Sequence, residues 1–217
     1  NWYFRLFGPG SRPEWSGIAS GCSHPHKNPD RNAMHTIDRQ REQLEVAGIL
    51  EVPAPSLDWA PLPVDMNLGS ELVLIVPGGA IHRPRKRWPV QRFTELAIKI
   101  AEIGLRPILI GDLNDASLIG TIVDRVESAV NLAGQTSLLQ LAGLCRCARL
   151  AIGNDTGPMH MAVIAGAPSL VLFSKNSDPA LCAQRGPEVK ILRRSNLDDL
   201  PFEEVWAVAA NIIARGS

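Results

Sequence analysis

The residues with the clearest chemistry form a polar, glycine-flanked turn at positions 153–160, Gly-Asn-Asp-Thr-Gly-Pro-Met-His. The turn opens into a helical pattern, in which Thr156 or Gly157 can be the N-cap and Pro158 fits the first turn. The unpaired N–H groups and the positive dipole end of such a helix favour a diphosphate ligand. Asp155 suits sugar hydroxyls beside the phosphates better than the phosphates themselves. We therefore predict a diphosphate at this helix N-terminus, with a sugar next to it.

His160 falls about one turn into the same helix. A single histidine on a helix more commonly has a structural role. Its position beside the polar turn favours a contact with the ligand. Both interpretations stay open at the level of the sequence.

A second ligand-binding pattern follows the apolar run at 72–76, where Gly78 and Gly79 precede a basic segment. Glycines allow backbone N–H groups to approach a ligand closely. The basic segment holds four cations within five residues, namely Arg83, Arg85, Lys86 and Arg87. A glycine turn beside clustered cations favours a phosphate ligand. The alternative is a solvated basic loop at the edge of a domain.

An acidic segment follows the next apolar run. Asp112 and Asp115 lie there, and either carboxylate can accept hydrogen bonds from ribose hydroxyls. The alternative is that Asn114 or Asp115 caps the helix that follows. Further along the chain, the backbone of Gly134 can meet a nucleobase.

The segment after Gly134 predicts the start of another helix. Thr136 and Ser137 are both suited to cap it. Taken alone, this pattern is a weak indication of a ligand site.

Apolar runs alternate with helical patterns through the second part of the chain. The runs lie at 72–76, 107–110, 130–132, 150–152, 169–173 and 189–192, and the helical patterns at 93–101, 118–126, 138–144, 159–165 and 201–215. This alternation predicts an α/β fold, a parallel sheet with helices on both faces. Ligands of such sheets bind beyond the carboxyl ends of the strands, where the turns described above begin.

Residues 1–68 have a different texture, rich in Pro, Gly, Trp and His. A helix is predicted from Thr36 to Ala47, with Thr36 as its cap and Gly48 at its end. Residues 52–63 carry four prolines and are predicted to be a linker. We therefore expect residues 1–68 to be the remainder of an N-terminal domain with its linker, and residues 69–217 to form the second domain.

Composition excludes several classes of protein. The chain has 22 basic and 22 acidic residues, 45% hydrophobic and 20% charged residues, as in soluble globular proteins. A zero net charge argues against a nucleic-acid-binding surface. Four uneven cysteines favour reduced thiols in the cytoplasm over a disulfide scaffold. For Cys22, His24 and His26 a loop is the preferred interpretation, and a metal site the alternative.

Together, these motifs resemble glycosyltransferase family 9, the ADP-heptose–lipopolysaccharide heptosyltransferases. The resemblance rests on Pro77-Gly78-Gly79, Lys86-Arg87-Trp88-Pro89, and the segments 132–138 and 153–162, and it extends from about residue 70 to 192. It implies the GT-B architecture, in which two Rossmann-like domains face each other across a cleft. The resemblance implies that residues 69–217 are the C-terminal Rossmann-like, nucleotide-sugar-binding domain, and that residues 1–68 are the remainder of the N-terminal, acceptor-side domain with the interdomain linker. The N-terminal domain would then be incomplete in this chain.

The resemblance also implies roles for individual residues. Lys86 and the backbone amides of Thr156 and Gly157 would contact the diphosphate, Asp155 the sugar, and Asp115 the ribose. Asp155 and Lys86 are the predicted catalytic residues. The predicted substrate-binding residues are Gly78, Gly79, Lys86, Asp115, Gly134, Thr136, Asp155, Thr156, Gly157 and His160.

The implied reaction is the transfer of a heptose from ADP-heptose to a lipopolysaccharide core acceptor with inversion. No metal or cofactor is expected, since cations and the helix dipole would stabilise the departing diphosphate. The family's general base, an Asp near its N-terminus, has no matching position here. The chain alone is therefore expected to bind nucleotide weakly and to transfer no sugar.

The expected partners are a nucleotide sugar and a lipopolysaccharide core acceptor at the inner membrane surface, with no nucleic acid and no protein partner. The expected location is the cytoplasm, either free or peripheral at the inner membrane. Two alternatives remain at this level. One is a non-catalytic nucleotide-binding fragment, and the other is a nucleotide-sugar 2-epimerase of the same architecture.

Overall fold

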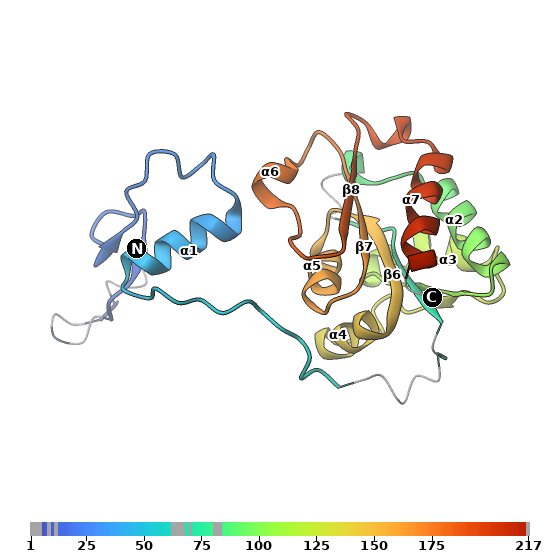
Figure 1. Ribbon diagram of the computed structural model, residues 1–217, viewed down its shortest axis with the longest axis horizontal. Helices are drawn as coiled ribbons and strands as arrows, with labels where there is room; N and C mark the ends of the chain where they lie inside the picture. The colour runs from blue at the N-terminus through green and yellow to red at the C-terminus, as the bar shows by residue number, and fades with distance from the viewer. Residues whose placement is uncertain are drawn as a thin grey trace. The chain divides into compact units, whose positions relative to one another are not determined.

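The computed structural model describes residues 6–7, 10, 13–61, 68–69, 71–79 and 84–215 (Figure 1). The chain divides into two compact units. The first comprises residues 1–54 with 180–182, and the second comprises residues 55–179 with 183–217.

The second unit is built on a parallel sheet whose strands run in the order β5-β4-β3-β6-β7-β8. The strands are β3 (Leu72–Val76), β4 (Arg106–Leu109), β5 (Val130–Asn131), β6 (Ala148–Asn154), β7 (Ser169–Phe173) and β8 (Val189–Arg193). The helices of this unit are α2 (Val90–Glu102), α3 (Ala116–Val123), α4 (Leu138–Cys147), α5 (Gly157–Ile164) and α7 (Phe202–Arg215). Helix α6 (Pro179–Cys182) begins at the last residue of the segment 55–179, and its other residues are assigned to the first unit. Short 3-10 helices lie at η3 (Pro84–Lys86), η4 (Leu113–Asp115) and η5 (Leu197–Asp199). The predicted α/β fold with a parallel sheet is confirmed.

The hydrophobic core lies on both faces of this sheet because strands β3 and β7 are buried along their whole length. All five residues of β3 are buried, as are all five of β7. Helices α2, α3 and α7 pack together on one face (Figure 1). Helices α4 and α5 pack against each other and against β6. Among the helices described, none has the length and apolar character needed to cross a membrane.

The chain adds strands on one side of β3 first and then on the other side, so the strand order reverses between β3 and β6. From β3 the chain proceeds to β4 and β5 on one side, and from β6 to β7 and β8 on the other. β3 and β6 are paired neighbours, with Val76 opposite Gly153 at their carboxyl ends. A reversal of this kind opens a crevice beyond the strand ends. The polar segments that follow β3 and β6 therefore leave the sheet side by side.

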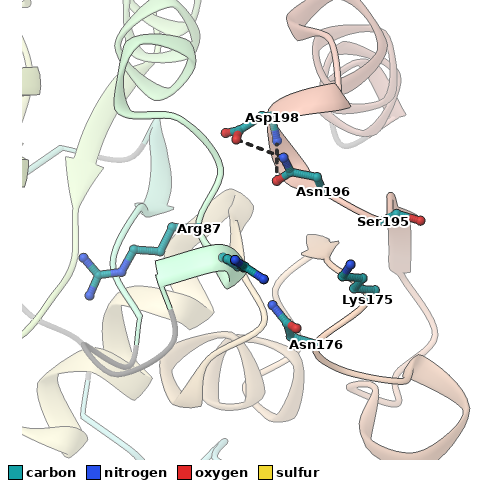
Figure 2. Close-up of a pocket in the computed structure, with 7 residues that line it drawn as sticks. Arg87, Lys175, Asn176, Ser195, Asn196 and Asp198 are labelled. Carbon is teal, nitrogen blue, oxygen red and sulfur yellow. Dashed lines mark hydrogen bonds between the residues drawn. The ribbon is translucent and has the colours of Figure 1, made fainter.

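At the β8 edge of the sheet, also on the side of the carboxyl ends, the segment after β8 leads into η5 (Figure 2). Asn196 caps η5, since its Oδ1 accepts from the Asp198 N–H at 3.3 Å. Its Nδ2 also donates to Asp198 Oδ2 at 3.0 Å. A backbone hydrogen bond from Lys175 N to Ser195 O, at 3.4 Å, joins this segment to the one that follows β7.

The first unit contains the helix α1 (Thr36–Val46) and a short parallel pair, β1 (Ser16–Gly17) and β2 (His24–Pro25). The prediction that Thr36 caps the helix is wrong. The cap is His35, whose Nδ1 accepts from the Ile37 N–H at 3.2 Å. An imidazole nitrogen can replace a hydroxyl here because the N-cap requires only an acceptor near that N–H. Gly48, with φ of 84°, follows the helix end as predicted.

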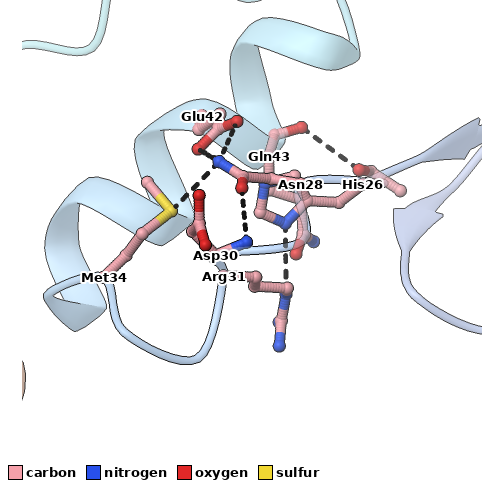
Figure 3. Close-up of polar contacts among 8 residues, drawn as sticks. His26, Asn28, Asp30, Arg31, Met34, Glu42 and Gln43 are labelled. Atoms are coloured by element: carbon pink, nitrogen blue, oxygen red, sulfur yellow. Dashed lines mark hydrogen bonds and ion pairs between the residues drawn. The ribbon is translucent and has the colours of Figure 1, made fainter.

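A network of polar side chains surrounds the buried His26 in this unit (Figure 3). Its Nδ1 accepts from Arg31 Nε at 3.1 Å, and its Nε2 lies 3.5 Å from Glu42 Oε2. Asn28 Nδ2 donates to the same carboxylate at 2.8 and 2.9 Å. Within the described part of the chain, no group of three His, Cys, Asp or Glu side chains could hold a metal ion.

Candidate functional site

Asp155, the first residue after β6, is held by three side chains. Its Oδ2 accepts from Lys86 Nζ at 2.7 Å and from the Ser177 hydroxyl at 2.6 Å. Its Oδ1 accepts from Gln184 Nε2 at 3.3 Å. Burial raises the pKa of Asp155, but these donors and the Lys86 charge outweigh burial, so its pKa lies below the ordinary value. The carboxylate is therefore ionised at neutral pH.

The structure brings together two residues that lie 69 positions apart in the chain, Lys86 and Asp155. Their side chains are only 13% and 8% exposed, so solvent screens the pair weakly. Lys86 was expected to contact a diphosphate, and here its ammonium is paired with a carboxylate. A ligand that binds the Lys86 ammonium must therefore either share it with Asp155 or replace Asp155 as its partner.

Trp88 positions Lys86, which explains the Lys-x-Trp spacing. Its side chain is 2% exposed and packs edge-on against Phe93, with ring centroids 5.0 Å apart. Its indole N–H donates to Leu200 O at 2.9 Å. Anchored in the core in this way, Trp88 holds the end of η3 so that Lys86 can reach Asp155.

Asn154, the last residue of β6, connects three segments of the site. It is fully buried, and its Nδ2 donates to Pro77 O at 2.8 Å and to Gly78 O at 3.1 Å. Its Oδ1 accepts from Trp88 N at 2.9 Å. Both polar groups of the amide are thus satisfied inside the protein. Asn154 fixes the loop after β3 and the segment after η3 against the end of β6.

The loop after β3 packs so closely against Asp115 that a side chain at position 78 would displace the loop or the carboxyl group. A Cβ on Gly78 would lie 2.1 Å from Asp115 Oδ2, and one on Gly111 would lie 2.8 Å from Asp115 Cβ. A Cβ on Gly79 would lie 3.3 Å from Thr156 Cγ2. Gly78 is therefore in contact with Asp115, which also accepts a hydrogen bond from the Gly79 backbone, and Thr156 lies beside Gly79.

Asp115 has fewer partners than Asp155. Its residue is 7% exposed, and its Oδ1 lies 3.5 Å from an Arg87 nitrogen, too far for a hydrogen bond. Among the described residues, that oxygen has no hydrogen-bond partner. Burial and the neighbouring Asp112 charge raise the pKa of Asp115, although Arg87 and backbone N–H groups oppose the shift. A buried acceptor without a donor is costly, so this oxygen is suited to a ligand hydroxyl.

Asp115 keeps its carboxyl available because a different residue caps the segment after β4. Asp112 Oδ1 accepts from Asn114 N at 2.7 Å and caps η4. Asp115 stands at the N-cap position of α3, where its side chain makes no capping bond. The two acids proposed from the sequence therefore have different functions in the fold.

The N-terminus of α5 has the predicted form. Thr156 is the N-cap with extended backbone angles, φ of −148° and ψ of 168°, and Pro158 lies in the first turn. The Thr156 side chain makes no capping bond, since its hydroxyl donates to Asn154 O at 3.2 Å. Gly157 is exposed, and a Cβ there would meet no atom within 4 Å. His160 is exposed in the first turn of α5.

Gly134 lies beyond β5 with a φ of 66°, and its N–H donates to Gly111 O at 2.9 Å. A Cβ at this position would lie 2.4 Å from a methyl group of Leu113, whose residue is 76% exposed. An exposed apolar side chain thus lies over a glycine. Ser137 caps α4 and forms a capping box with Gln140, whereas Thr136 is half-buried beside it.

Several residues of this arrangement were not predicted from the sequence. They are Ser177 and Gln184, which hold Asp155, and Asn154, which connects the loops. Of these, Asn154 alone had a signal in the sequence, because an asparagine at the end of an apolar strand indicates a buried polar contact. Arg87 belongs to the predicted basic cluster, but its contacts with Gly79 O and Asp115 were not predicted. Arg83, from the predicted basic cluster, lies outside the described residues.

The chain is similar in sequence to lipopolysaccharide heptosyltransferase 2 of Salmonella typhimurium. The two are 33% identical over 119 residues, which are 52% of this chain and 34% of that relative. The chain thus matches about a third of the length of this curated relative.

Two solved structures share the fold. The Escherichia coli heptosyltransferase WaaC with ADP gives a TM-score of 0.71 at 20% identity, covering 88% of this chain and 60% of that one. The E. coli ADP-heptose LPS heptosyltransferase II gives a TM-score of 0.65 at 23% identity, covering 76% and 53%. At these identities the likeness concerns the fold.

The sequence profile of one family covers most of the chain. It matches residues 26–202, which include both the glycine loop after β3 and the turn after β6. The resemblance inferred from the motifs is confirmed, and the chain belongs to glycosyltransferase family 9, the heptosyltransferases.

Proposed function

We propose that this chain is the donor-binding part of an enzyme that transfers a heptose from ADP-heptose to a lipopolysaccharide core acceptor, with inversion and without a metal ion. The observation that carries the proposal is the Lys86–Asp155 pair, which lies between a glycine loop and the N-terminus of α5. Family membership supports the reaction class, and two relatives named for ADP or ADP-heptose support the donor.

The donor would lie along the carboxyl edge of β4, β3 and β6. The diphosphate would contact the N–H groups at the start of α5, which have no partner within the helix. The unpaired Oδ1 of Asp115 would accept from a ribose hydroxyl, and exposed Leu113 over Gly134 would contact the base. The open space around Gly157 is where a phosphate would approach the helix.

The chemistry is a displacement at the anomeric carbon of the heptose. The acceptor oxygen forms a bond to that carbon, the bond to the β-phosphate oxygen breaks, and ADP leaves with the electron pair. Lys86 and the positive end of α5 would stabilise the charge that develops on the diphosphate. Asp155 would orient Lys86 and accept from a hydroxyl of the sugar.

Asp155 is a poor candidate for the base that takes the proton of the acceptor hydroxyl. Its pKa lies below the ordinary value because Lys86, Ser177 and Gln184 donate to it, and a weak base transfers protons inefficiently at neutral pH. We assign no base to this chain and expect it to transfer no sugar by itself. A lipopolysaccharide acceptor would locate the reaction at the cytoplasmic surface of the inner membrane.

Calorimetric titration with ADP and ADP-heptose tests the proposal. Lys86→Ala should weaken binding by about 1.5–3 kcal/mol, the range for a hydrogen bond to a charged group. Lys99→Ala is the matched control, because Lys99 is exposed on α2 and pairs with Glu102 on the same helix. Equal affinities of wild type and Lys86→Ala for both ligands would refute the role of Lys86.

A second measurement tests where the base lies. The chain is incubated with ADP-heptose and a lipopolysaccharide core acceptor, and released ADP is assayed. Nucleotide binding without transfer is the expected result. Transfer that Asp155→Ala abolishes would show that a base lies within residues 1–217.

A further inference from the structure

A pocket of about 460 Å³ lies beside the candidate site, at the carboxyl ends of β7 and β8. It is lined by Arg85, Arg87, Lys175, Asn176, Ser195, Asn196 and Asp198. These residues come from η3 and the residue after it, the segment after β7, and the segment that runs from the end of β8 into η5. The volume falls within the range of about 300–1,000 Å³ typical of small-molecule sites.

Two cations in this pocket are unpaired. Arg85 and Lys175 are exposed, and neither forms an ion pair with any residue that the structure describes. The acidic residue of the pocket, Asp198, is engaged with Asn196 on the same segment. The lining holds three cations and one carboxylate, so the pocket carries a net positive charge.

Arg87 belongs to the candidate site more than to the pocket. Figure 2 shows its side chain extending away from the other labelled residues. Its guanidinium donates to Gly79 O and faces Asp115 Oδ1 at 3.5 Å. The free charge of the pocket thus comes from Arg85 and Lys175.

Two short segments connect this pocket to the site of Asp155. In η3, Arg85 lines the pocket while the next residue, Lys86, pairs with Asp155. After β7, Lys175 lines the pocket while Ser177, two residues later, donates to Asp155. The pocket is therefore next to the predicted sugar position but uses different side chains.

We propose that this pocket binds a phosphate or carboxylate group carried by the sugar acceptor, with Arg85 and Lys175 as the residues that contact the anion. The anion's assignment to the acceptor rests on the proposed function. Lys175 and Arg85 supply the charge, and Asn176, Ser195 and Asn196 supply hydroxyl and amide groups for the sugar that bears the anion. The pocket is much larger than a free ion requires, so it fits an anion attached to a sugar.

Chemical-shift titration of the ¹⁵N-labelled chain tests the proposal, with inorganic phosphate, glucose 6-phosphate and glucuronate as probes. At least one sugar probe should shift the amide signals of Lys175, Asn176 and Ser195 saturably and bind at least as tightly as inorganic phosphate. Arg85→Ala and Lys175→Ala should each weaken binding about tenfold, which is about 1.4 kcal/mol. Lys190→Ala, an exposed cation on β8 outside the pocket, should leave the affinity unchanged.

Three results would overturn the proposal. They are the absence of saturable shifts at the pocket, displacement of the probe by ADP, and tighter binding of inorganic phosphate than of both sugar probes. Displacement would show that the pocket is part of the nucleotide site, and tighter phosphate binding would show a site for the free ion. A different result would contradict the proposed function, namely the absence of ADP binding in calorimetry.

Discussion

The end of β6 and the end of β4 each hold a buried aspartate near a cation, and the two carboxyl groups have opposite pKa shifts. Asp155 receives hydrogen bonds from Lys86, Ser177 and Gln184, and its pKa is lowered. Asp115 is packed against two glycines, leaves one oxygen without a donor, and its pKa is raised.

The comparison shows that burial alone does not decide the charge of a site. Burial raises the pKa of both carboxyl groups. Direct donors to the ionised form reverse that effect only where three side chains converge, at Asp155. At Asp115 the Arg87 nitrogen stays 3.5 Å away, so the opposing attraction is weaker. Asp155 is thus stabilised in its ionised form, whereas Asp115 keeps one carboxylate oxygen that can accept a hydrogen bond from a ligand.

The largest expected effect tests the close packing at Asp115. Gly78→Ala places a methyl group 2.1 Å from a carboxylate oxygen, so the loop or Asp115 must move. We expect the free energy of unfolding to fall by about 3 kcal/mol, the upper end of the range for overpacking. Urea denaturation measures it. Gly120→Ala on α3, which meets no atom within 4 Å, should instead stabilise by about 0.5–1 kcal/mol. Equal stability of Gly78→Ala and wild type would contradict the described packing.

The next effect compares the two carboxyl groups directly. Asp155→Asn leaves the nearly buried Lys86 ammonium without its counter-charge, and we expect a loss of about 2 kcal/mol in unfolding free energy. Asp115→Asn removes an unfavourably buried charge and should change stability by less than about 1 kcal/mol. The same urea experiment checks both variants. A larger loss for Asp115→Asn than for Asp155→Asn would reverse the comparison.

A smaller effect isolates one donor to Asp155. Ser177→Ala removes the hydroxyl that lies 2.6 Å from Oδ2 and should cost about 1 kcal/mol of unfolding free energy. Ser117→Ala is the matched control, because Ser117 is exposed on α3. If both variants are as stable as wild type, Ser177 does not contribute to holding the carboxylate.

The smallest effect is a difference in pH dependence. The stabilisation from Asp155, whose pKa is lowered, is present above the ordinary aspartate value of about 3.9 and is lost as pH falls through the folded-state pKa. Asp115, whose pKa is raised, has the opposite sign: its cost is relieved as pH falls from the raised pKa toward about 3.9. The stability advantage of wild type over Asp155→Asn should therefore shrink in acid, while wild type should gain relative to Asp115→Asn. Urea titrations between neutral and acidic pH measure both differences, and slopes of the same sign would contradict the opposite shifts.

Much of the fold could be predicted because it depends on local patterns. The run Leu72–Val76 is apolar at every position, as a strand buried on both faces must be, and it forms β3 with those bounds. The turn after β6 was identified because its cap, proline and glycines are neighbours in the chain. The helix in the first unit was predicted with the wrong cap, because the choice between Thr36 and His35 depends on which acceptor faces the Ile37 N–H.

The residues that complete the site could not be predicted, because their partners are distant in the chain. Ser177 and Gln184 are ordinary polar residues in the sequence, and they matter only because they meet Asp155, 22 and 29 positions away. Asn154 reaches Pro77 and Gly78 because β3 and β6 are neighbours in the sheet.

The sequence by itself determined the class of fold, the order of strands and helices, and the family, because each depends on residue type and spacing within short segments. Only the tertiary structure decided that Lys86 pairs with Asp155, that Asp115 keeps an unpaired oxygen, and that Arg85 and Lys175 share a pocket. The physical reason is that hydrogen bonding, burial and charge at a site depend on distances between strand ends. Those distances are set by strand order in the sheet, and they cannot be predicted from any single segment.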